Sequence, residues 1–381
     1  MESNNKPPIT IAFFSALPPF RGGISSFSKF LVQALKSKVL VNAFTFKRQY
    51  PSFLFPGGTQ FEANQREAYP RIVTSYNPFT YLHSSRILRA DTPTVFIANY
   101  WMPFFAPMYV FMAKRFHKSV CKVALIHNLT PHEKRFFDQK MNQWFVNHFD
   151  LFIVLSEKVR QDVLSYNPKA ICKVIGHPKY EQFGVLKDRQ SQRNKLGIDK
   201  SEKVLLFFGL VRDYKGLDLL IDSFDFLDDS YVLLIAGEVY GDKRKYIEQI
   251  EKLKGNKVIF HDTFIPDEDV SNYFSAADCC VLPYKNGTQS GIQAIANSFQ
   301  VPVLVSKNGG LHEGVLDGEN GFVLESLDPE GIASKIDHVF TGGKLQIVRD
   351  NLQRQQSSNL DEWSVFADEL LNFISVKNPN R

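Results

Sequence analysis

Short apolar runs recur along the chain, and amphipathic helical patterns separate them. The clearest runs are ITIAFF, TVFIAN, KVALIH and LFIVLS in the first half, and KVLLFFGL, YVLLIAG, KVIFH, CCVLPY and VPVLVS in the second. Continuous apolar strands that alternate with helices are typical of parallel sheets covered on both faces. The pattern therefore predicts an α/β fold built from doubly wound parallel sheets.

The pattern restarts after IGHPKYEQFG at residues 175–184, where a polar stretch follows. A chain of 381 residues also exceeds one ordinary domain. We expect a first domain over residues 1–184 and a second over residues 185–360. Ligands of such sheets bind outside the carboxyl ends of the strands, so site residues should directly follow strands, at a cleft where the two domains face each other.

Gly22 and Gly23 stand between a strand that ends near Phe14 and a helix that begins near Ser25. Glycines there would let bare backbone approach a ligand, and the free N–H groups of a helix start favour an anion. The segment is neither a Walker A motif nor a GxGxxG fingerprint. An ordinary tight turn is the alternative that this junction leaves open.

Arg212 and Lys215 follow the strand that ends at Gly209, directly before an amphipathic helix. Arginine binds phosphate as a fork and lysine binds it as a point charge, so the pair would suit a diphosphate. Cations are disfavoured at the positive end of a helix, which argues against ordinary surface charge at this place. We expect the two residues to bind an anionic group.

A third junction follows the run CCVLPY, where NGTQSGIQAIA begins a helix with Gln289, Ser290, Gly291 and Ile292. Backbone N–H groups at that helix start would point at a ligand. After the next strand, Gly309 and Gly310 form another loop of bare backbone. Glu313 then stands where a carboxylate could accept hydrogen bonds from hydroxyl groups.

His127 ends the run KVALIH and would point toward the strand ends of the first domain. A lone histidine is more often structural, but its place at a strand end favours a ligand contact. The chain has no CxxC pair and no HExxH motif, so we expect no metal. Its four cysteines are too scattered for a disulfide framework, which favours a reducing compartment.

Positive charge is concentrated in the first half, because residues 1–180 contain 23 basic and 9 acidic residues while the whole chain carries +5. A solvated surface or an anionic partner would explain that surplus. The stretch 101–118 is apolar nearly all round and ends in basic residues. We expect it to be buried against the first sheet; the alternative is peripheral contact with an anionic membrane. No signal peptide is visible, and we expect a cytoplasmic protein, with the inner face of the membrane as the alternative location.

Together, and in this order, the junctions resemble glycosyltransferase family 4, retaining enzymes with the two-Rossmann architecture called GT-B. The matching segments are PPFRGGISSFS, HN at 127–128, GLVRDYKG, NGTQSGIQAIANSFQVPVLVS and GGLHEGVLDGENGF. The resemblance implies that a C-terminal helix, here within residues 361–381, packs back onto the first domain. It also implies a nucleotide diphosphate sugar as donor, no cofactor, and a hydroxyl of a glycan or lipid-linked acceptor, as in bacterial polysaccharide assembly.

By that resemblance, Arg212 and Lys215 would hold the donor diphosphate during catalysis, and His127 would touch the sugar. The implied donor-binding set is Gly22, Gly23, Gly209, Gln289, Ser290, Gly291, Ile292, Gly309, Gly310 and Glu313. Many family members carry two glutamates where this chain has Gly287 and Ile295, and the segment TQSG is similar to a subset of the family. The side chains that could replace those carboxylates are Gln289, Gln293 and Glu313. The arginine that usually follows the glycine is replaced by Leu210, with Arg212 two residues further on.

Other classes of function stay open at this point. A nucleotide-sugar-binding module without transfer activity would explain the missing glutamates. A nucleic-acid binder would need a recognised motif, which the chain lacks, so we expect no nucleic acid partner. A nicotinamide enzyme would need the GxGxxG turn and the acidic residue that follows it, and the chain lacks both.

Overall fold

The structure is a computed structural model that describes residues 8–51, 60–61, 69–130, 136–180, 182–255, 257–356 and 361–378. The chain forms two compact units, which are described separately below. Unit 1 comprises Met1–Gly176 together with Asp361–Arg381, and unit 2 comprises His177–Leu360. The division falls a few residues before the boundary expected at residue 184, because the segment after Gly176 packs on unit 2: Tyr180 approaches Gly291, and Gly184 approaches Ser271.

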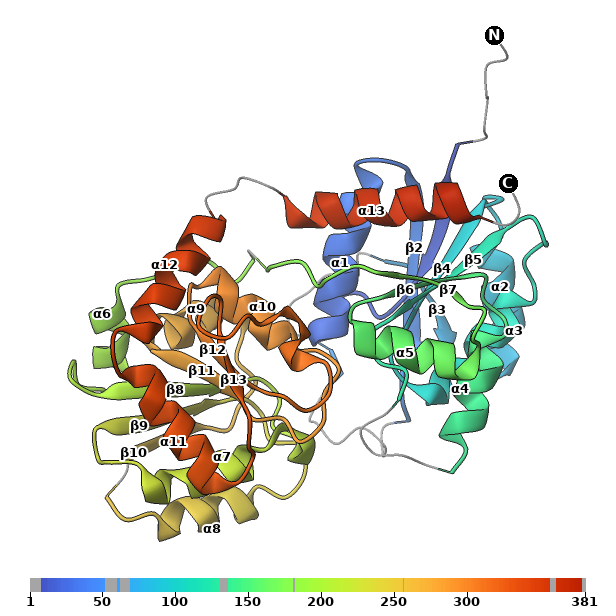
Figure 1. Ribbon diagram of the computed structural model, residues 1–381. Helices are drawn as coiled ribbons and strands as arrows, with labels where there is room; N and C mark the ends of the chain where they lie inside the picture. The colour runs from blue at the N-terminus through green and yellow to red at the C-terminus, as the bar shows by residue number, and fades with distance from the viewer. Residues whose placement is uncertain are drawn as a thin grey trace. The chain divides into compact units, whose positions relative to one another are not determined.

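Unit 1 is built on a seven-stranded parallel sheet with the order β3-β2-β1-β4-β5-β6-β7 (Figure 1). Its strands are β1 Thr10–Phe14, β2 Leu40–Arg48, β3 Arg71–Thr74, β4 Val95–Tyr100, β5 Cys121–Ile126, β6 Leu151–Val154 and β7 Ile171–Val174. The central strands are buried on both sides, since Phe13 and Phe14 are neighbours in β1 and both are fully covered. Two-sided burial is the reason that such strands appear in the sequence as unbroken apolar runs.

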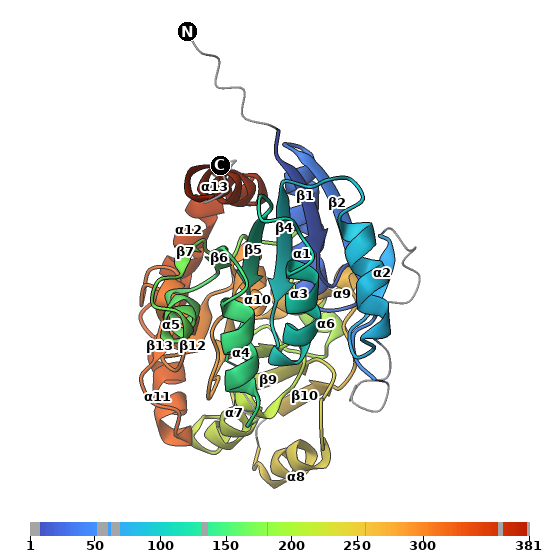
Figure 2. The same cartoon turned by 90° about the vertical axis from the view of Figure 1, so that its right-hand side faces the viewer.

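Helices cover both faces of this sheet. One face carries α1 Gly23–Lys36 and α13 Glu362–Lys377, and the other carries α2 Phe79–Leu88, α3 Ala106–Ala113, α4 Asp138–Val146 and α5 Glu157–Tyr166 (Figure 2). The C-terminal helix α13 packs on α1 through Phe27 and Trp363, whose ring centroids lie 5.1 Å apart. Lys38 and Asp368 form an ion pair of 2.9 Å beside that contact.

The apolar stretch over residues 101–118 is buried in unit 1. It forms the short helix η2 Pro103–Phe105 and then α3, where Met108 and Met112 are fully covered. The expectation of burial is confirmed for the apolar side chains of this stretch, which pack into the core. In the described part of the chain, no helix has the length and apolar character needed to cross a bilayer.

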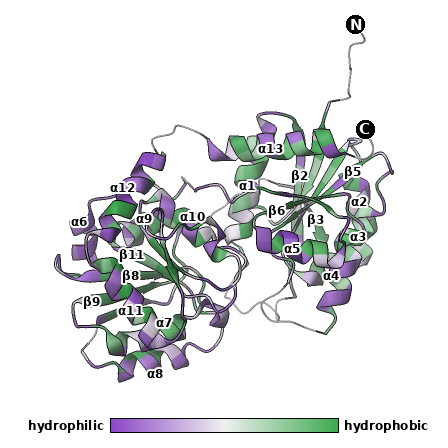
Figure 3. Cartoon of the chain, in the orientation of Figure 1, coloured by the Kyte–Doolittle hydropathy of each residue, from purple (hydrophilic) through white to green (hydrophobic). Residues whose placement is uncertain are grey.

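Unit 2 is built on a six-stranded parallel sheet with the order β10-β9-β8-β11-β12-β13. Its strands are β8 Lys203–Phe208, β9 Tyr231–Ala236, β10 Lys257–His261, β11 Cys279–Leu282, β12 Val303–Ser306 and β13 Phe322–Leu324. Its helices are α6 Arg189–Lys195, α7 Leu217–Ser223, α8 Arg244–Lys252, α9 Asp267–Ala276, α10 Gly291–Ser298, α11 Pro329–Phe340 and α12 Lys344–Gln356. The core beneath α7, α8, α11 and α12 lies on one face, while Phe208 on the other face contacts Phe274 of α9. Figure 3 shows the strands of both units as mainly hydrophobic.

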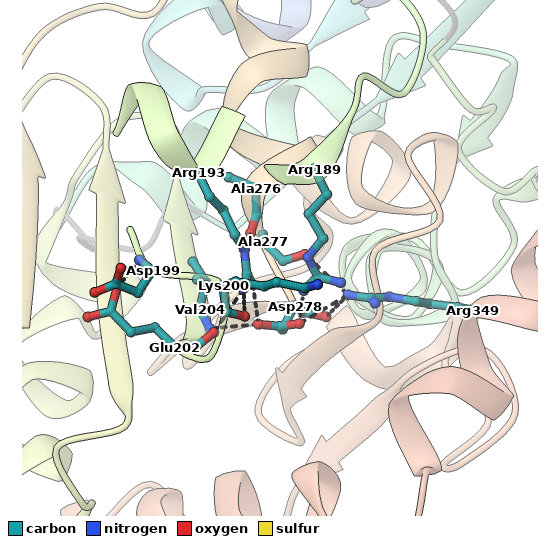
Figure 4. Close-up of polar contacts among 10 residues, drawn as sticks. All are labelled: Arg189, Arg193, Asp199, Lys200, Glu202, Val204, Ala276, Ala277, Asp278 and Arg349. Carbon is teal, nitrogen blue, oxygen red and sulfur yellow. Dashed lines mark hydrogen bonds and ion pairs between the residues drawn. The ribbon is translucent and has the colours of Figure 1, made fainter. Parts of the chain in front are cut away.

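A partly buried ionic cluster joins the first and last helices of unit 2 to its sheet. Asp278, directly before β11, accepts hydrogen bonds from Arg193 at 2.6 Å and from the N–H of Val204 at 2.7 Å, and it also pairs with Arg189. Arg349 of α12 donates to the carbonyl oxygen of Asp278 at 2.9 Å (Figure 4). Three guanidinium groups therefore share one carboxylate, which ties α6 and α12 to the edge of β11.

Both sheets reverse their strand order at one place. In unit 1 the chain builds outward from β1 to β3 and then returns to β4 beside β1; in unit 2 it returns from β10 to β11 beside β8. At such a switch point the loops after the two adjacent strands diverge and leave a crevice at the carboxyl ends. The candidate places for a ligand are therefore the loops after β1 and β4, and those after β8 and β11.

Candidate functional site

The switch point of unit 2 is closed by direct backbone contact between two loops. Gly209, which follows β8, has a φ of +88°, and Gly216 has a φ of +71°. A Cβ at Gly216 would lie 2.1 Å from the carbonyl oxygen of Pro283, which follows β11. Only glycine combines this conformation with so close an approach, so the loop that carries Arg212 and Lys215 is held against the loop after β11.

Lys215 is the central side chain of this crevice. It lies in the short helix η3 Asp213–Lys215, is 8% exposed, and its Nζ is 5.5 Å from the centroid of the Tyr284 ring. Its ammonium group forms no hydrogen bond or ion pair with any residue that the structure describes. Burial, and secondly the positive charge of Arg212, lower the pKa of Lys215 to about 7. A lysine in this state gains most from an anion, which would replace the hydration that the ammonium group has lost.

Arg212 supplies a second cation at the start of η3. Its guanidinium lies 4.9 Å above the ring of Tyr240 and makes no hydrogen bond or ion pair within the described ranges. The carboxylates nearest in sequence are engaged elsewhere, because Lys245 pairs with Asp213 and Lys285 pairs with Asp218 at 2.6 Å. Arg212 and Lys215 therefore share a surplus of positive charge, and that surplus suits a polyphosphate.

The start of α10 lies at the same crevice. Ser290 caps the helix by accepting a hydrogen bond from the N–H of Ile292 at 3.3 Å, and its hydroxyl is 3.1 Å from the hydroxyl of Tyr284. The side chain of Ile292 lies 3.0 Å from the position of a Cβ on Gly209. Of the amides expected around residues 290–292 to hold a phosphate, that of Ile292 already has an acceptor. Gly291 approaches the ring of Tyr180 instead.

Gly309 and Gly310 have a packing role that the sequence did not indicate. Gly309 has a φ of +75°, and a Cβ there would lie 1.9 Å from the carbonyl oxygen of Gly287. Gly310 donates its N–H to the same oxygen at 2.7 Å. The bare backbone of this loop is therefore in contact with the neighbouring loop at Gly287. Glu313 follows in η5 Leu311–Gly314 with an exposed side chain, whereas Gln289 is partly buried.

At the switch point of unit 1, the first turn of α1 lacks a side-chain cap. Gly22 is the N-cap residue with a φ of +105°, and no atom lies within 4 Å of a Cβ placed on Gly22 or Gly23. Ser25, in the same turn, is 3% exposed, and its hydroxyl has no hydrogen-bond partner in the described part of the protein. Open space, uncapped N–H groups and an unsatisfied hydroxyl together provide donors for a polar ligand.

A buried polar chain lies beneath this turn. The hydroxyl groups of Ser15, after β1, and Ser28, in α1, are 2.6 Å apart, and Asn99 of β4 donates to Ser28 at 2.8 Å. The Oδ1 atom of Asn99 has no hydrogen-bond partner among the described residues. His127 follows β5 and donates its backbone N–H to Tyr100 at 2.9 Å; its buried ring packs edge-on against Phe27.

The structure thus brings Gly209, Lys215, Ser290 and Ile292 together in unit 2, with Arg212 close enough to lower the pKa of Lys215. Gly22, Gly23 and His127 belong to unit 1. The residues at these sites that sequence reasoning missed are Tyr284, Tyr240, Ser25 and Asn99. Tyr284 could have been found only from the strand order, because β8 and β11 are adjacent in the sheet and far apart in the chain.

The chemistry available at these sites is electrostatic and hydrogen-bonding. Cys280 lies near Lys215, but burial raises the pKa of its thiol to about 12, so it stays protonated at neutral pH. Over the described ranges, no group of three or more His, Cys, Asp and Glu side chains is arranged to hold a metal ion. The arrangement in unit 2 can bind an anionic group and stabilise negative charge that develops on it.

Both units match family models of glycosyltransferases. Residues 21–178 match Glycosyltransferase Family 4, and residues 188–356 match Glycosyl transferases group 1. D-inositol 3-phosphate glycosyltransferase from Corynebacterium diphtheriae is 27% identical over 228 residues, which cover 56% of this chain and 51% of that protein. The chain thus spans about half the length of the curated relatives it matches.

Solved structures share the fold over nearly the whole chain. Sucrose-phosphate synthase from Thermosynechococcus elongatus has a TM-score of 0.76 at 16% identity and covers 96% of this chain and 98% of its own. The Anabaena protein HepE in complex with UDP-glucose has a TM-score of 0.74 at 18% identity, with coverages of 96% and 99%. The fold is the GT-B type, as the sequence predicted.

Proposed function

We propose that this chain, whose two units each match a glycosyltransferase family, is a retaining glycosyltransferase that uses a nucleotide diphosphate sugar. The sugar would pass to a hydroxyl group of a glycan or lipid-linked acceptor, as in bacterial polysaccharide assembly. The GT-B fold and the two family matches support glycosyl transfer. The UDP-glucose held by HepE, a neighbour in fold, makes a uridine diphosphate sugar the first donor to test.

The observation that carries the proposal is the state of Lys215. A buried lysine without a counter-ion is costly, and a second cation beside it increases that cost. A fold keeps such an arrangement where a ligand supplies the missing negative charge. A diphosphate would bring that charge to the crevice after β8 and β11, with Arg212 as a fork and Lys215 as a point charge.

In the proposed reaction, most of the negative charge develops on the departing diphosphate. The bond between the anomeric carbon and the phosphate oxygen breaks, and a bond from that carbon to the acceptor oxygen forms on the same face. The acceptor's proton passes to the departing phosphate oxygen, so configuration is retained without a protein nucleophile. Arg212 and Lys215 stabilise the negative charge that grows on the leaving group, which is the main electrostatic task.

Unit 1 would contribute the open first turn of α1. Gly22 and Gly23 leave room above it, and Ser25 offers an unsatisfied hydroxyl. These groups suit oxygen atoms of a bound donor or acceptor. His127, held by Phe27, would orient a sugar hydroxyl rather than act as a base.

The missing glutamates are the main reason to weigh a second candidate, a nucleotide-sugar-binding module without transfer activity. At Gly287, one of the two glutamate positions, a Cβ would lie 2.6 Å from Cδ1 of Leu311 and 3.0 Å from the ring of Tyr284, so a side chain there would need these two residues to move. The proposed replacements for the sugar contacts are Gln289, Gln293 and Glu313. Gln293 lies near Gly314, with 3.9 Å between its Nε2 and the position of a Cβ on that glycine.

A panel of UDP-, GDP- and ADP-sugars tests the proposal and separates the two candidates. The correct donor should raise the melting temperature by mass action. Slow release of free sugar and nucleotide diphosphate in water, with the anomeric configuration read by NMR, would identify a retaining enzyme. A stabilising donor that is never cleaved, even with acceptor glycans or glycolipids present, would identify the binding module.

A lipid-linked acceptor would place the protein in the cytoplasm against the inner face of an anionic membrane. The surplus of basic residues in the first half of the chain supports this part of the proposal. Exposed Lys114 and Arg115, which directly follow α3, belong to that surplus. Flotation with anionic vesicles at low salt should carry the protein upward, and a protein that stays in the lower fractions would refute the membrane contact.

A further inference from the structure

In the glycosyltransferase family that this chain resembles, the arginine directly follows the glycine, whereas here Leu210 follows it and Arg212 comes two residues later. Residues outside this loop are therefore needed to hold the Arg212 side chain at the crevice. We infer that Tyr240 and Lys245, from the segment after β9, position Arg212 for the diphosphate. The inference rests on the proposed function of Arg212. Neither residue is expected to touch the ligand.

Backbone hydrogen bonds fix Tyr240 beside Arg212. Val211 donates its N–H to Glu238 at 2.9 Å, and Tyr240 donates its N–H to Val211 at 2.9 Å. This short ladder extends the pairing of β8 with β9 past the ends of both strands. The register of the ladder therefore places Tyr240 beside the residue that follows Val211.

The aromatic ring can hold the guanidinium without using its hydrogen-bond donors. The centre of the Arg212 guanidinium lies 4.9 Å from the centroid of the Tyr240 ring. A carboxylate partner would occupy the N–H groups and cancel the charge, whereas a cation–π contact leaves the N–H groups around the guanidinium edge available. Tyr240 thus restrains Arg212 and preserves the properties needed to bind phosphate.

Lys245 protects that positive charge from the next residue in the chain. Asp213 follows Arg212 directly, and its carboxylate would otherwise be a natural partner for the guanidinium. Lys245 of α8 pairs with Asp213 instead. The segment after β9 therefore acts twice: Tyr240 supports the arginine, and Lys245 engages the competing carboxylate.

Calorimetric titration of the full-length protein with inorganic pyrophosphate tests this directly, since that probe needs no knowledge of the nucleotide. Tyr240→Leu should weaken pyrophosphate binding about two- to fivefold, the range that a cation–π contact at an exposed site implies. Tyr240→Phe, which keeps the ring, should bind within about twofold of the wild type. Lys245→Gln should weaken binding about as much as Tyr240→Leu, because it frees Asp213 to pair with Arg212.

Arg244→Gln is the matched control for Lys245→Gln. It removes one positive charge from the same helix, but Arg244 pairs with Asp242 and its side chain is 80% exposed. Pyrophosphate affinity should not change in this variant. Equal weakening in Arg244→Gln and Lys245→Gln would assign the effect to overall charge and overturn the role of Lys245.

A double variant separates positioning from a general structural effect. If Tyr240 acts through Arg212, then Tyr240→Leu should have no further effect on affinity in an Arg212→Gln background. Additive losses, or equal affinities of Tyr240→Leu and Tyr240→Phe, would overturn the inference even if Arg212→Gln itself weakens binding. Unchanged affinity in Arg212→Gln would instead overturn the proposed diphosphate site. If Tyr240→Leu does not fold, the comparison of Lys245→Gln with Arg244→Gln still tests whether the segment after β9 positions Arg212.

Discussion

Lys215 and Tyr284 face each other across the switch point of unit 2, with 5.5 Å between the ammonium nitrogen and the ring centroid. The two residues are far apart in the chain and meet because β8 and β11 are neighbours in the sheet. The ring gives the ammonium group a weak electrostatic partner, and the hydroxyl of Tyr284 reaches Ser290 at the start of α10. The contact links the cationic loop after β8 to the helix start after β11, the two parts that the proposed site requires.

The lowered pKa of Lys215 predicts a measurable pH dependence of stability. Its pKa is 10.5 in ordinary surroundings and about 7 in the folded protein. Between these values the unfolded chain binds more protons than the folded one, so this group makes stability rise with pH, by up to about 1.4 kcal/mol per pH unit. Below pH 7 the full cost of burying the charge applies.

The variant Lys215→Met should remove that cost and flatten the slope. Urea unfolding from pH 6 to pH 10 should show the variant more stable than the wild type at low pH, with the difference shrinking as pH rises. Lys203→Met is the control, because Lys203 also lies over a tyrosine ring, Tyr231, but at the opposite end of β8 and 36% exposed. Parallel pH profiles for the wild type and Lys215→Met would show that Lys215 is not perturbed.

Gly23→Ala should separate binding from stability. The position is the first residue of α1, and a Cβ there meets no atom within 4 Å. Alanine is the better helix former, so we expect the free energy of unfolding to stay the same or rise by up to about 1 kcal/mol. The added methyl group would occupy the space above the first turn and weaken donor or acceptor binding. An alanine variant with unchanged kinetic constants would show that this space is unused.

Gly309→Ala, unlike Gly23→Ala, should destabilise the protein. Its Cβ would lie 1.9 Å from the carbonyl oxygen of Gly287, and the φ of +75° adds strain. We expect a loss of more than about 2 kcal/mol in the free energy of unfolding, because backbone on both sides would have to move. A thermally stable Gly309→Ala protein would contradict the described contact between the two loops.

Ser25→Ala should raise stability and lower activity. The Ser25 hydroxyl is buried without a partner among the described residues, so its removal should stabilise the protein by about 1 kcal/mol. Ser28→Ala, one turn further along α1, should destabilise by about 1 kcal/mol, because Ser28 bonds to Ser15 and Asn99. Stability comes from thermal unfolding and activity from donor turnover. Equal effects of the two substitutions on both readouts would remove Ser25 from the site.

The cluster at Asp278 predicts an unequal effect of its members on unfolding. Asp278→Asn would leave three guanidinium groups without their carboxylate and should cost about 3 kcal/mol or more in urea unfolding. Arg189→Gln should cost less than about 1 kcal/mol, because the Arg189 side chain is 35% exposed and Arg193 and Arg349 still pair with the carboxylate in its absence. A larger loss from Arg189→Gln than from Asp278→Asn would contradict this account.

The central strands of both sheets could be predicted from sequence because burial on both faces makes them continuous apolar runs. The strands that the sequence reading missed are β2, β3, β7 and β13. Strands β3, β7 and β13 lie at sheet edges and are short, so their burial is partial and their apolar pattern is weak. Asn42 and Thr45 interrupt the apolar pattern of β2.

The candidate site was predicted in part, through residues that directly follow strands. Arg212 and Lys215 lie in the loop after β8, and Ser290 ends the loop after β11; both loops lie at the same edge of the sheet because its strands are parallel. The strand order, which no local pattern encodes, decides that Tyr284 is the partner of Lys215. The close approach of Gly309 to Gly287 could not be predicted either, because a glycine that makes room for a ligand and a glycine that makes room for another loop look alike in sequence.

Proton uptake on binding is the most direct test that a diphosphate meets Lys215. At pH 8 a lysine with a pKa of about 7 is about one-tenth charged, and a bound diphosphate should restore most of the charge. Calorimetry at pH 8 with UDP, or with GDP or ADP if that nucleotide stabilises the protein more, in buffers of different ionisation enthalpy should then show uptake approaching one proton per nucleotide. The Lys203→Met protein should behave likewise. Tight nucleotide binding by the wild type with no proton uptake would contradict the account.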